Sequence, residues 1–359
     1  MNFKKRSLFG SLAIASSLLL AACGGGDEAS TDPADDDATG EETYEWRFAT
    51  EEWPGQVQYE YAQEFADKLN EKSDGRINID VYEFGGLGSE VDQVEMLQTG
   101  GVEFGIISPG FTGTLVPEGN IFALQFLFPD DLELNQQILN ESEALNTHLA
   151  EKYLEQDIMP LAFWHEGAMQ WTGSSELRTP EDFEGFQMRT QESPLILESY
   201  RAYGAEPTPM SWDDLYLSLE QGIVDGQENP IFFIEDANFH EVQEHMTLSQ
   251  HNIYVTMTTV NPTFFEGLPE DIQDMILETT EEMRDRGYEI QKELNEELLT
   301  VIEEDTDNPT EVIELTEEER DAFRQQALPV RDFYVDEVGE DGQMILDMLE
   351  AEIEEALNE

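Results

Sequence analysis

The side chains of this sequence that could carry out catalysis or bind a cofactor mostly lack the spacing that such chemistry requires. A run of glycines at residues 85–88 lies between an expected strand and an expected helix, but has neither G-x-G-x-x-G spacing nor a Gly-Lys-Ser/Thr ending. The five histidines form no metal-binding spacing, and no Gly-x-Ser-x-Gly elbow for a nucleophilic serine is present. We therefore expect a simple turn at the glycines and no catalytic residues, metal or cofactor.

One cation stands out because the chain is so acidic. Arg189 lies at the end of an expected strand, residues 186–190, in a chain with 17 basic and 81 acidic residues. A guanidinium can hold a carboxylate with two parallel hydrogen bonds. From position alone, a surface arginine in a salt bridge is an equally good interpretation.

Six aromatic residues lie next to expected turns or element ends. They are Trp53, Phe111, Trp164, Trp212, Phe232 and Phe233. Packing in the core is the default for each, but together they could surround a cationic ligand.

The elements that would position these residues alternate between strands and helices. Strands are expected at residues 44–50, 77–82, 102–107, 159–164 and 186–190. Helices are expected around residues 61–69, and at 89–99, 194–203, 211–221, 268–304, 316–327 and 337–357. This alternation predicts an α/β protein, and the length suits one large or two medium domains.

The N-terminus has the pattern of an export signal. Basic residues 4–6 precede an apolar run at 8–20, which is shorter than a membrane span requires, and small residues lead to the only cysteine, Cys23. Leu20-Ala21-Ala22-Cys23 resembles the lipobox of bacterial lipoproteins, which implies that residues 1–22 are removed and that Cys23 is acylated. A secretory signal followed by chance by a cysteine, or an N-terminal membrane anchor, are the alternatives. Residues 23–43, acidic and without aromatics, predict a flexible tether.

The formal net charge of −64 limits the possible partners. A surface this anionic repels nucleic acid and anionic lipid headgroups. Because the acidic residues are spread along the whole chain, we interpret them as an adaptation to a saline exterior, where salt screens the repulsion.

Three motifs in order resemble the solute-binding proteins of tripartite ATP-independent periplasmic (TRAP) transporters. They are RTPEDFEGFQMR at 178–189, GAEPTPM at 204–210 and GIVDGQENP at 222–230. The resemblance implies a periplasmic-binding-protein-like α/β fold with two lobes, joined by crossing strands and a long helix. Residues 44–167 and 253–292 would form the first lobe, and 168–252 and 293–359 the second. It also implies that Arg189 binds a substrate carboxylate, assisted by Asn229.

Within this family the chain is most similar to the ectoine and hydroxyectoine receptors. The matching stretches are WRFATEE at 46–52, SPGFTG at 108–113 and NPIFFIE at 229–235. Ectoine carries a delocalised amidinium ring and one carboxylate. The resemblance implies that Glu52 faces the cation and Arg189 the carboxylate. Phe111, Trp212 and Phe232 would cover the faces of the ring. Trp164 and Met169 are further expected ligand-binding residues.

The chain departs from the family pattern at two positions. Many acid-binding members have a second arginine in a Gly-x-Arg stretch, where this chain has Met169. This change suits a ligand with a single carboxylate. Phe233 stands where an ectoine receptor would be expected to have tryptophan, which leaves the ligand open.

The leading hypothesis is therefore a non-enzymatic, lipid-anchored, extracytoplasmic receptor. It would be a monomer that captures ectoine or 5-hydroxyectoine and delivers it to membrane permease subunits. The alternatives are the same fold binding a four-carbon dicarboxylate or a monocarboxylate, an exported hydrolase, or a purely structural lipoprotein.

Overall fold

Two mixed β-sheets form the framework of this protein. The computed structural model describes residues 42–358, so the expected signal, Cys23 and most of the expected tether lie outside the described residues. Strand order in the five-stranded sheet is β2-β1-β3-β10-β4. These strands are β1 (Tyr44–Ala49), β2 (Ile77–Tyr82), β3 (Phe104–Ile107), β4 (Met159–Ala168) and β10 (Ile253–Val260). β1 pairs in parallel with β2 and β3, whereas β10 is antiparallel to β3 and β4.

The six-stranded sheet has the order β11-β9-β5-β8-β6-β7. Its strands are β5 (Gln170–Gly173), β6 (Gln187–Thr190), β7 (Glu206–Pro209), β8 (Gly226–Asn229), β9 (His245–Leu248) and β11 (Glu311–Glu314). β5 is antiparallel to β8 and β9, and β6 is parallel to β7 and β8. The α/β architecture predicted from the sequence is therefore confirmed, as two mixed sheets with helices.

The helical segments between the strands of the first sheet are α1 (Val57–Lys72), α2 (Glu90–Gln98), α3 (Pro109–Thr112), η1 (Pro117–Ala123), α4 (Leu132–Glu141), η2 (Ala144–Leu149) and α5 (Ala150–Leu154). Those of the second sheet are η3 (Pro180–Phe183), α6 (Pro194–Ala202), η4 (Trp212–Asp214), α7 (Leu215–Glu220), α8 (Ile231–Asp236) and η5 (Phe239–Glu241). After β10 come α9 (Pro262–Glu266), α10 (Glu270–Glu282), α11 (Arg286–Glu304), α12 (Glu317–Ala327) and α13 (Val330–Ala356).

Local sequence explains where several of these helices begin. α2 starts with a capping box, in which the Ser89 hydroxyl accepts from the Asp92 N–H and the Asp92 carboxylate accepts from the Ser89 N–H. α6 starts at Pro194, whose missing N–H costs nothing at this position, behind the capping hydroxyl of Ser193.

The expected continuous helix at 268–304 is in fact two helices, α10 and α11, separated at residues 283–285. Met283 is fully buried in the core at this break. Arg286 then begins α11 and forms an ion pair with Glu64 of α1. Helical periodicity continues across the turn, which explains why the pattern did not reveal the break.

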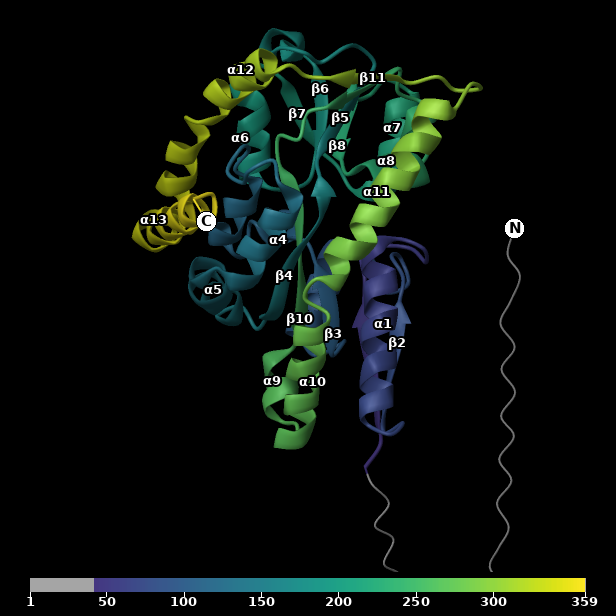
Figure 1. Cartoon of the computed structure of the whole chain (residues 1–359), viewed down its shortest axis with the longest axis vertical. Coiled ribbons are helices and arrows are strands. Elements are labelled where there is room, and N and C mark those ends of the chain that lie inside the picture. Colours follow the sequence, from purple (N-terminus) through teal and green to yellow (C-terminus); the bar gives the residue numbers. More distant parts are fainter. Residues whose placement is uncertain (1–41, 359) are drawn as a thin grey trace, which may run out of the picture. The chain divides into compact units, whose positions relative to one another are not determined.

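The two sheets meet at a short hinge. Only Met169 separates β4 from β5, and residues 249–252 connect β9 to β10. The two connections are held together because the Met169 N–H donates to the Asn252 carbonyl, at 2.8 Å. α11 is a third connection, since it packs on both β4 and α8; Figure 1 shows it running past β4 toward α7 and α8.

Gly167 allows α11 to pass close to this hinge. Its φ of +112° favours glycine, and a Cβ there would lie 2.7 Å from Asn295 Nδ2 and 2.8 Å from Gln291 Oε1, both on α11. A larger residue would be strained at this φ and would force the ends of the Asn295 and Gln291 side chains to move.

Strands from the expected first-lobe segments form the five-stranded sheet, and strands from the expected second-lobe segments form the six-stranded sheet. The long C-terminal helix α13, expected in the second lobe, packs against η1 and η2 as well as α6. The lobe boundaries themselves stay a prediction. Within residues 42–358, no helix is both long enough and apolar enough to cross a membrane.

Candidate ligand-binding site

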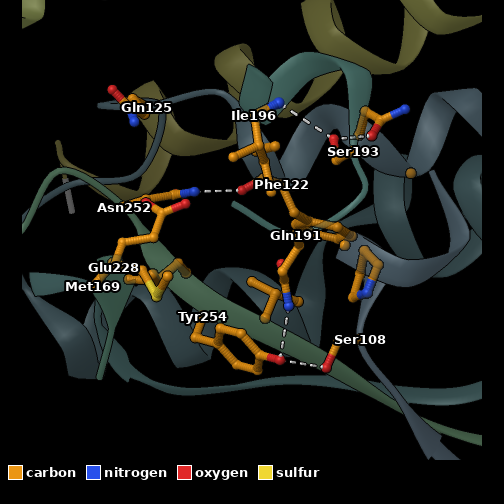
Figure 2. Close-up of a pocket in the computed structure, with 17 residues that line it drawn as sticks. Ser108, Phe122, Gln125, Met169, Gln191, Ser193, Ile196, Glu228, Asn252 and Tyr254 are labelled. Atoms are coloured by element: carbon orange, nitrogen blue, oxygen red, sulfur yellow. Dashed lines mark hydrogen bonds between the residues drawn. The ribbon is translucent and has the colours of Figure 1, made fainter. Parts of the chain in front are cut away.

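A small cavity, partly open to solvent, lies beside the hinge. Its lining comes from both sides of the hinge and includes Ser108, Met169, Gln191, Glu228, Asn252 and Tyr254. Figure 2 shows Met169, Glu228 and Asn252 gathered on one side of the cavity, and Gln191, Tyr254 and Ser108 joined by hydrogen bonds on another. This cavity marks the place where groups from the two sheets converge.

Arg189 does not itself line this cavity, but Gln191, two residues after it, does. Arg189 lies on β6 with 3% of its surface exposed, and its Nε and Nη2 donate to the Met210 carbonyl at 3.2 and 2.9 Å. Each of the other nine arginines in residues 42–358 forms an ion pair with a carboxylate, but Arg189 forms none. A guanidinium has five N–H donors, so Arg189 keeps donors for an anion.

Burial lowers the pKa of Arg189, and the nearby Glu90, Tyr254 and Glu228 partly offset that effect. An arginine in a protein stays charged even so. A buried charge is expensive unless it is paired. Binding of an anion beside Arg189 would therefore be electrostatically favourable.

Four carboxyl groups on the first-sheet side are buried, including that of Glu90 on α2. Those of Glu51, Glu52 and Glu166 are exposed by 9, 1 and 0%, and none of these three forms an ion pair within the described residues. Gln58 connects them: its N–H donates to Glu52 Oε2 at 2.6 Å, and its side-chain amide donates to Glu166 Oε1 at 2.9 Å. Glu52 Oε1 and Glu166 Oε2 are buried without a hydrogen-bond partner.

Burial dominates the protonation of these groups. It raises the pKa of Glu51 to about 8, against hydrogen bonds from Ser108 that lower it. Burial also raises the pKa of Glu52 and of Glu166, and the repulsion between these two carboxylates raises that of Glu52 further. Two such close carboxyls hold one proton between them unless a cation takes its place. The site thus has carboxyl groups opposite an unpaired arginine.

A chain of hydrogen bonds connects the two sides. The Ser108 hydroxyl donates to Glu51 Oε2 and lies 2.9 Å from the Tyr254 hydroxyl. The Gln191 side-chain amide in turn donates to Tyr254 Oη at 3.2 Å. Gln191 follows Arg189 by two residues, so the chain runs from the carboxyl groups to the end of the strand that bears the arginine.

Aromatic rings adjoin this region on the second-sheet side. The Trp212 ring lies 5.1 Å from that of Phe233, which lies 4.2 Å from Phe232 and 5.9 Å from Tyr254. Trp212 is only partly buried, as is Phe111 on α3, whereas Phe232 is 1% exposed and belongs to the core. The partly buried rings are the ones free to contact a ligand.

Of the remaining predicted site residues, some lie close to the cavity and others lie in the core. Asn229 is buried at the end of β8, and β8 pairs with the β6 strand that carries Arg189. Met169 lines the cavity, whereas Glu52 lies behind Gln58 and is not part of the lining. Trp164 lies in the core, where it stacks on Tyr61 at 4.8 Å and donates to the Thr258 hydroxyl at 3.0 Å.

Sequence reasoning missed several polar residues around the cavity. Tyr254 lies on β10, a strand that was not predicted, and Glu166 lies in β4 beyond the end of the expected strand at residues 159–164. Glu228 was part of a recognised motif, but nothing in the motif said that its side chain lines a cavity. The adjacency of Glu51 and Glu52 was the one available signal. Within residues 42–358, no group of three or more His, Cys, Asp or Glu side chains could hold a metal ion.

Comparison with known proteins gives consistent relatives. Residues 48–337 match the family described as bacterial extracellular solute-binding protein, family 7. The "Ectoine-binding periplasmic protein TeaA" of Halomonas elongata is 37% identical over 314 residues, which cover 88% of this chain and 91% of that protein. The "Ectoine/5-hydroxyectoine-binding periplasmic protein UehA" of Ruegeria pomeroyi is 32% identical over 314 residues, covering 87 and 91%.

Among solved structures, the periplasmic ectoine-binding protein of the TeaABC TRAP transporter of Halomonas elongata superposes with a TM-score of 0.84 at 37% identity. The match covers 87% of this chain and 99% of that one.

Proposed function

This chain belongs to family 7 of the bacterial extracellular solute-binding proteins, and we propose that it is the receptor of a TRAP transporter for ectoine or 5-hydroxyectoine. The resemblance to ectoine receptors within the TRAP family, predicted from the sequence, is confirmed. The receptor would carry its ligand to membrane permease subunits as a monomer, without changing the ligand chemically.

The observation that carries this proposal is the buried, unpaired Arg189. It lies 3% exposed with a single backbone carbonyl as its hydrogen-bond acceptor, in a chain with 81 acidic residues. A ligand carboxylate supplies the missing counter-charge, and the planar guanidinium can bind it with two parallel hydrogen bonds. Asn229, on the neighbouring strand β8, would assist with its amide.

The cationic group of a zwitterion would suit the carboxyl groups on the first-sheet side of the site. The amidinium of ectoine would displace the proton held by Glu52 and Glu166 and donate to their unpartnered oxygens. Phe111 and Trp212, whose rings are partly buried, would cover the faces of the ligand ring, because aromatic faces attract delocalised cations. A ligand with one carboxylate and one cation would thus neutralise both sides at once.

Titration calorimetry against ectoine, 5-hydroxyectoine, succinate and lactate at high salt tests this assignment. We expect micromolar or tighter binding of one or both ectoines and much weaker binding of both acids. The reverse order would overturn the ectoine assignment and favour a receptor for organic acids. Binding of none of the four ligands by the folded protein would reject both.

We also propose that the chain is held outside the cytoplasm by a lipid on Cys23. The basic residues 4–6, the short apolar run and Leu20-Ala21-Ala22-Cys23 support this. Two acyl chains give stable anchoring where one is marginal. Cys23→Ala should abolish incorporation of labelled fatty acid and move the protein from the membrane to the soluble extracytoplasmic fraction. Labelling that persists in this variant would reject the anchor.

A further inference from the structure

The segment that follows β6 contacts a loop on the first-sheet side, and Gln191 lies at the centre of this contact. The loop, residues 108–120, runs from the end of β3 through α3 to η1 and carries Phe111. Gln191 follows β6 directly, two residues after Arg189, and its side chain is partly buried. Figure 2 shows its amide directed at the Tyr254 hydroxyl. Two residues expected to bind the ligand thus lie next to one contact between the two sides of the molecule.

Two close approaches hold the Gln191 side chain against the first-sheet side. Its Nε2 donates to Tyr254 Oη on β10, at 3.2 Å. Its amide also fills the space beside Gly110 of α3 that a side chain would occupy, since a Cβ there would lie 2.0 Å from Gln191 Oε1 and 2.6 Å from its Cδ. Gly110 lies outside the left-handed region, so its backbone would accept alanine. The close approach of Gln191, and not the backbone conformation, therefore requires glycine at this position.

The same segment makes a second contact two residues further along the chain. The hydroxyl of Ser193, which caps α6, donates to Asn120 Oδ1 at 2.6 Å, and both side chains are buried. The Asn120 amide in turn donates to the carbonyls of Gly113 and Pro117, at 2.8 and 3.1 Å, and so fixes the shape of the loop. The segment after β6 therefore contacts the loop at two points, one before and one after Phe111 in the sequence.

We propose that Gln191 is a positioning residue: by packing against Gly110, it sets the distance between β6 and the loop that carries Phe111. This inference rests on the proposed function, because it takes Arg189, on β6, and Phe111 as ligand contacts. A binding site assembled from two sides depends on such spacing, because a displacement of about 1 Å is enough to loosen it. Gln191 therefore acts on the ligand through the two residues that it holds in place.

Substitutions on both sides of this contact test the role, with ectoine as the probe and calorimetry as the measurement. Gln191→Ala removes the amide and should weaken binding about five-fold, as for the loss of one hydrogen bond. Gly110→Ala places a methyl group where the amide lies, so either the amide leaves Tyr254 or β6 moves away from the loop. Binding should then weaken about ten-fold. The stability of Gln191→Ala without ligand should be nearly unchanged, because this side chain is only partly buried.

The double variant shows whether the two positions act through one contact. In that case the alanine methyl group at position 110 occupies space that the shorter side chain at position 191 has vacated. The affinity of the double variant for ectoine should therefore lie within about three-fold of that of Gln191→Ala alone. Independent effects would instead multiply to a loss of about 50-fold. Effects that multiply overturn the inference, and so does an unchanged affinity in Gln191→Ala.

Gly119→Ala is the matched control. A Cβ on Gly119 would lie 2.2 Å from Tyr153 Oη, which belongs to α5 on the same side of the molecule as the loop. This variant should lower the stability of the ligand-free protein, and adding Gln191→Ala should not relieve its effect. If Gly110→Ala fails to fold, Gln191→Met takes its place, because it keeps the length of the side chain but cannot donate to Tyr254. Its affinity should lie between those of the unmodified protein and Gln191→Ala, and unchanged affinity in both Gln191 variants overturns the inference.

The outcomes separate this inference from the proposed function. If the unmodified protein binds ectoine but the effects at Gln191 and Gly110 multiply, the inference is overturned and the receptor assignment stands. If the unmodified protein binds succinate or lactate but not ectoine, the ectoine assignment is overturned. The same variants then test Gln191 with that acid, because the spacing between β6 and the loop matters for either kind of ligand.

Discussion

Two buried arginines of this protein stand in contrasting environments. Arg320 on α12 is 7% exposed and donates to both oxygens of Asp130, at 2.6 and 2.7 Å, and to the Gln250 carbonyl at 3.1 Å. Arg189 is buried more deeply, at 3%, but has only the Met210 carbonyl as an acceptor. The protein therefore provides a carboxylate counter-ion for Arg320 but none, within the described residues, for Arg189.

The difference separates a structural role from a binding role. The Arg320–Asp130 pair links α12 to the segment before α4, and needs no outside partner. Arg189 has no anionic partner within the described residues, and the carboxyl groups of Glu52 and Glu166 likewise have no cationic partner there. Buried charges left unpaired by the chain are costly, and a ligand of matching charge removes that cost.

The largest expected effect is the loss of ligand binding in Arg189→Ala. Removing this buried guanidinium, which has no ion-pair partner within the described residues, should weaken binding at least 100-fold, about 3 kcal/mol, as measured by calorimetry. Stability without ligand should change little or rise, because the variant no longer buries an unpaired charge. Arg189→Lys, which keeps the charge but not the planar fork, should give an intermediate affinity. An Arg189→Ala protein with normal affinity would remove this residue from the site.

The second prediction concerns Arg320, the arginine that is paired with Asp130. Arg320→Ala should lower the free energy of unfolding by about 2 kcal/mol, less than for a fully buried pair because the Asp130 side chain is 50% exposed. Ligand affinity of the folded variant should stay within two-fold of the original. Chemical denaturation and calorimetry on the same preparation measure both quantities. A large loss of affinity with unchanged stability would show that the two arginines do not differ in role as proposed.

The sequence revealed only one member of this pair of arginines. Arg189 stood out because it ends a strand inside a specific family motif, whereas Arg320 lies in a helical stretch where nothing signals its contact with Asp130, 190 residues away. The alternation of elements predicted the α/β class. It did not identify β10, although apolar and polar residues alternate along the first six positions of this strand, IYVTMTTV, and all eight of its residues are buried. The contact of Arg320 with Asp130 is a tertiary one, and local patterns do not contain it.

The surroundings of individual side chains were the hardest features to predict from the sequence. Trp164 and Trp212 looked alike in the sequence, as tryptophans next to element ends. In the folded chain Trp164 lies under α11, where a Cβ on Gly287 would come within 2.3 Å of its ring, while Trp212 stays partly exposed. Which one contacts the core depends on the packing of a helix that begins more than 120 residues later.

The third prediction tests the unpaired carboxyl groups through pH. Burial raises the pKa of Glu51 to about 8 from an ordinary value of 4.5, so the folded state holds a proton that the unfolded state releases. The associated stability is present below pH 4.5 and is lost as the pH rises toward 8. Between pH 6.5 and pH 8 at high salt, the unmodified protein should lose about 1–2 kcal/mol more than Glu51→Gln.

Thermal or chemical denaturation at several pH values measures this difference. Asp130→Asn is a suitable control, because that carboxylate is already paired with Arg320 and should not reproduce the effect of Glu51→Gln. Identical pH profiles for Glu51→Gln and the unmodified protein would show that the folded state does not hold the proton on Glu51.

The smallest expected effect comes from substituting Trp212. Trp212→Ala should weaken binding of a ring-bearing cation about ten-fold, equivalent to about 1.4 kcal/mol, with little change in stability, because the side chain is only partly buried. Trp212→Phe should recover part of that affinity, since a smaller ring still offers an aromatic face. Trp164→Phe should do the reverse, lowering stability through the lost hydrogen bond to Thr258 while leaving affinity intact. If both tryptophans affected stability alone, the rings beside Arg189 would belong to the core, and the unpaired charges would be the only determinants of binding.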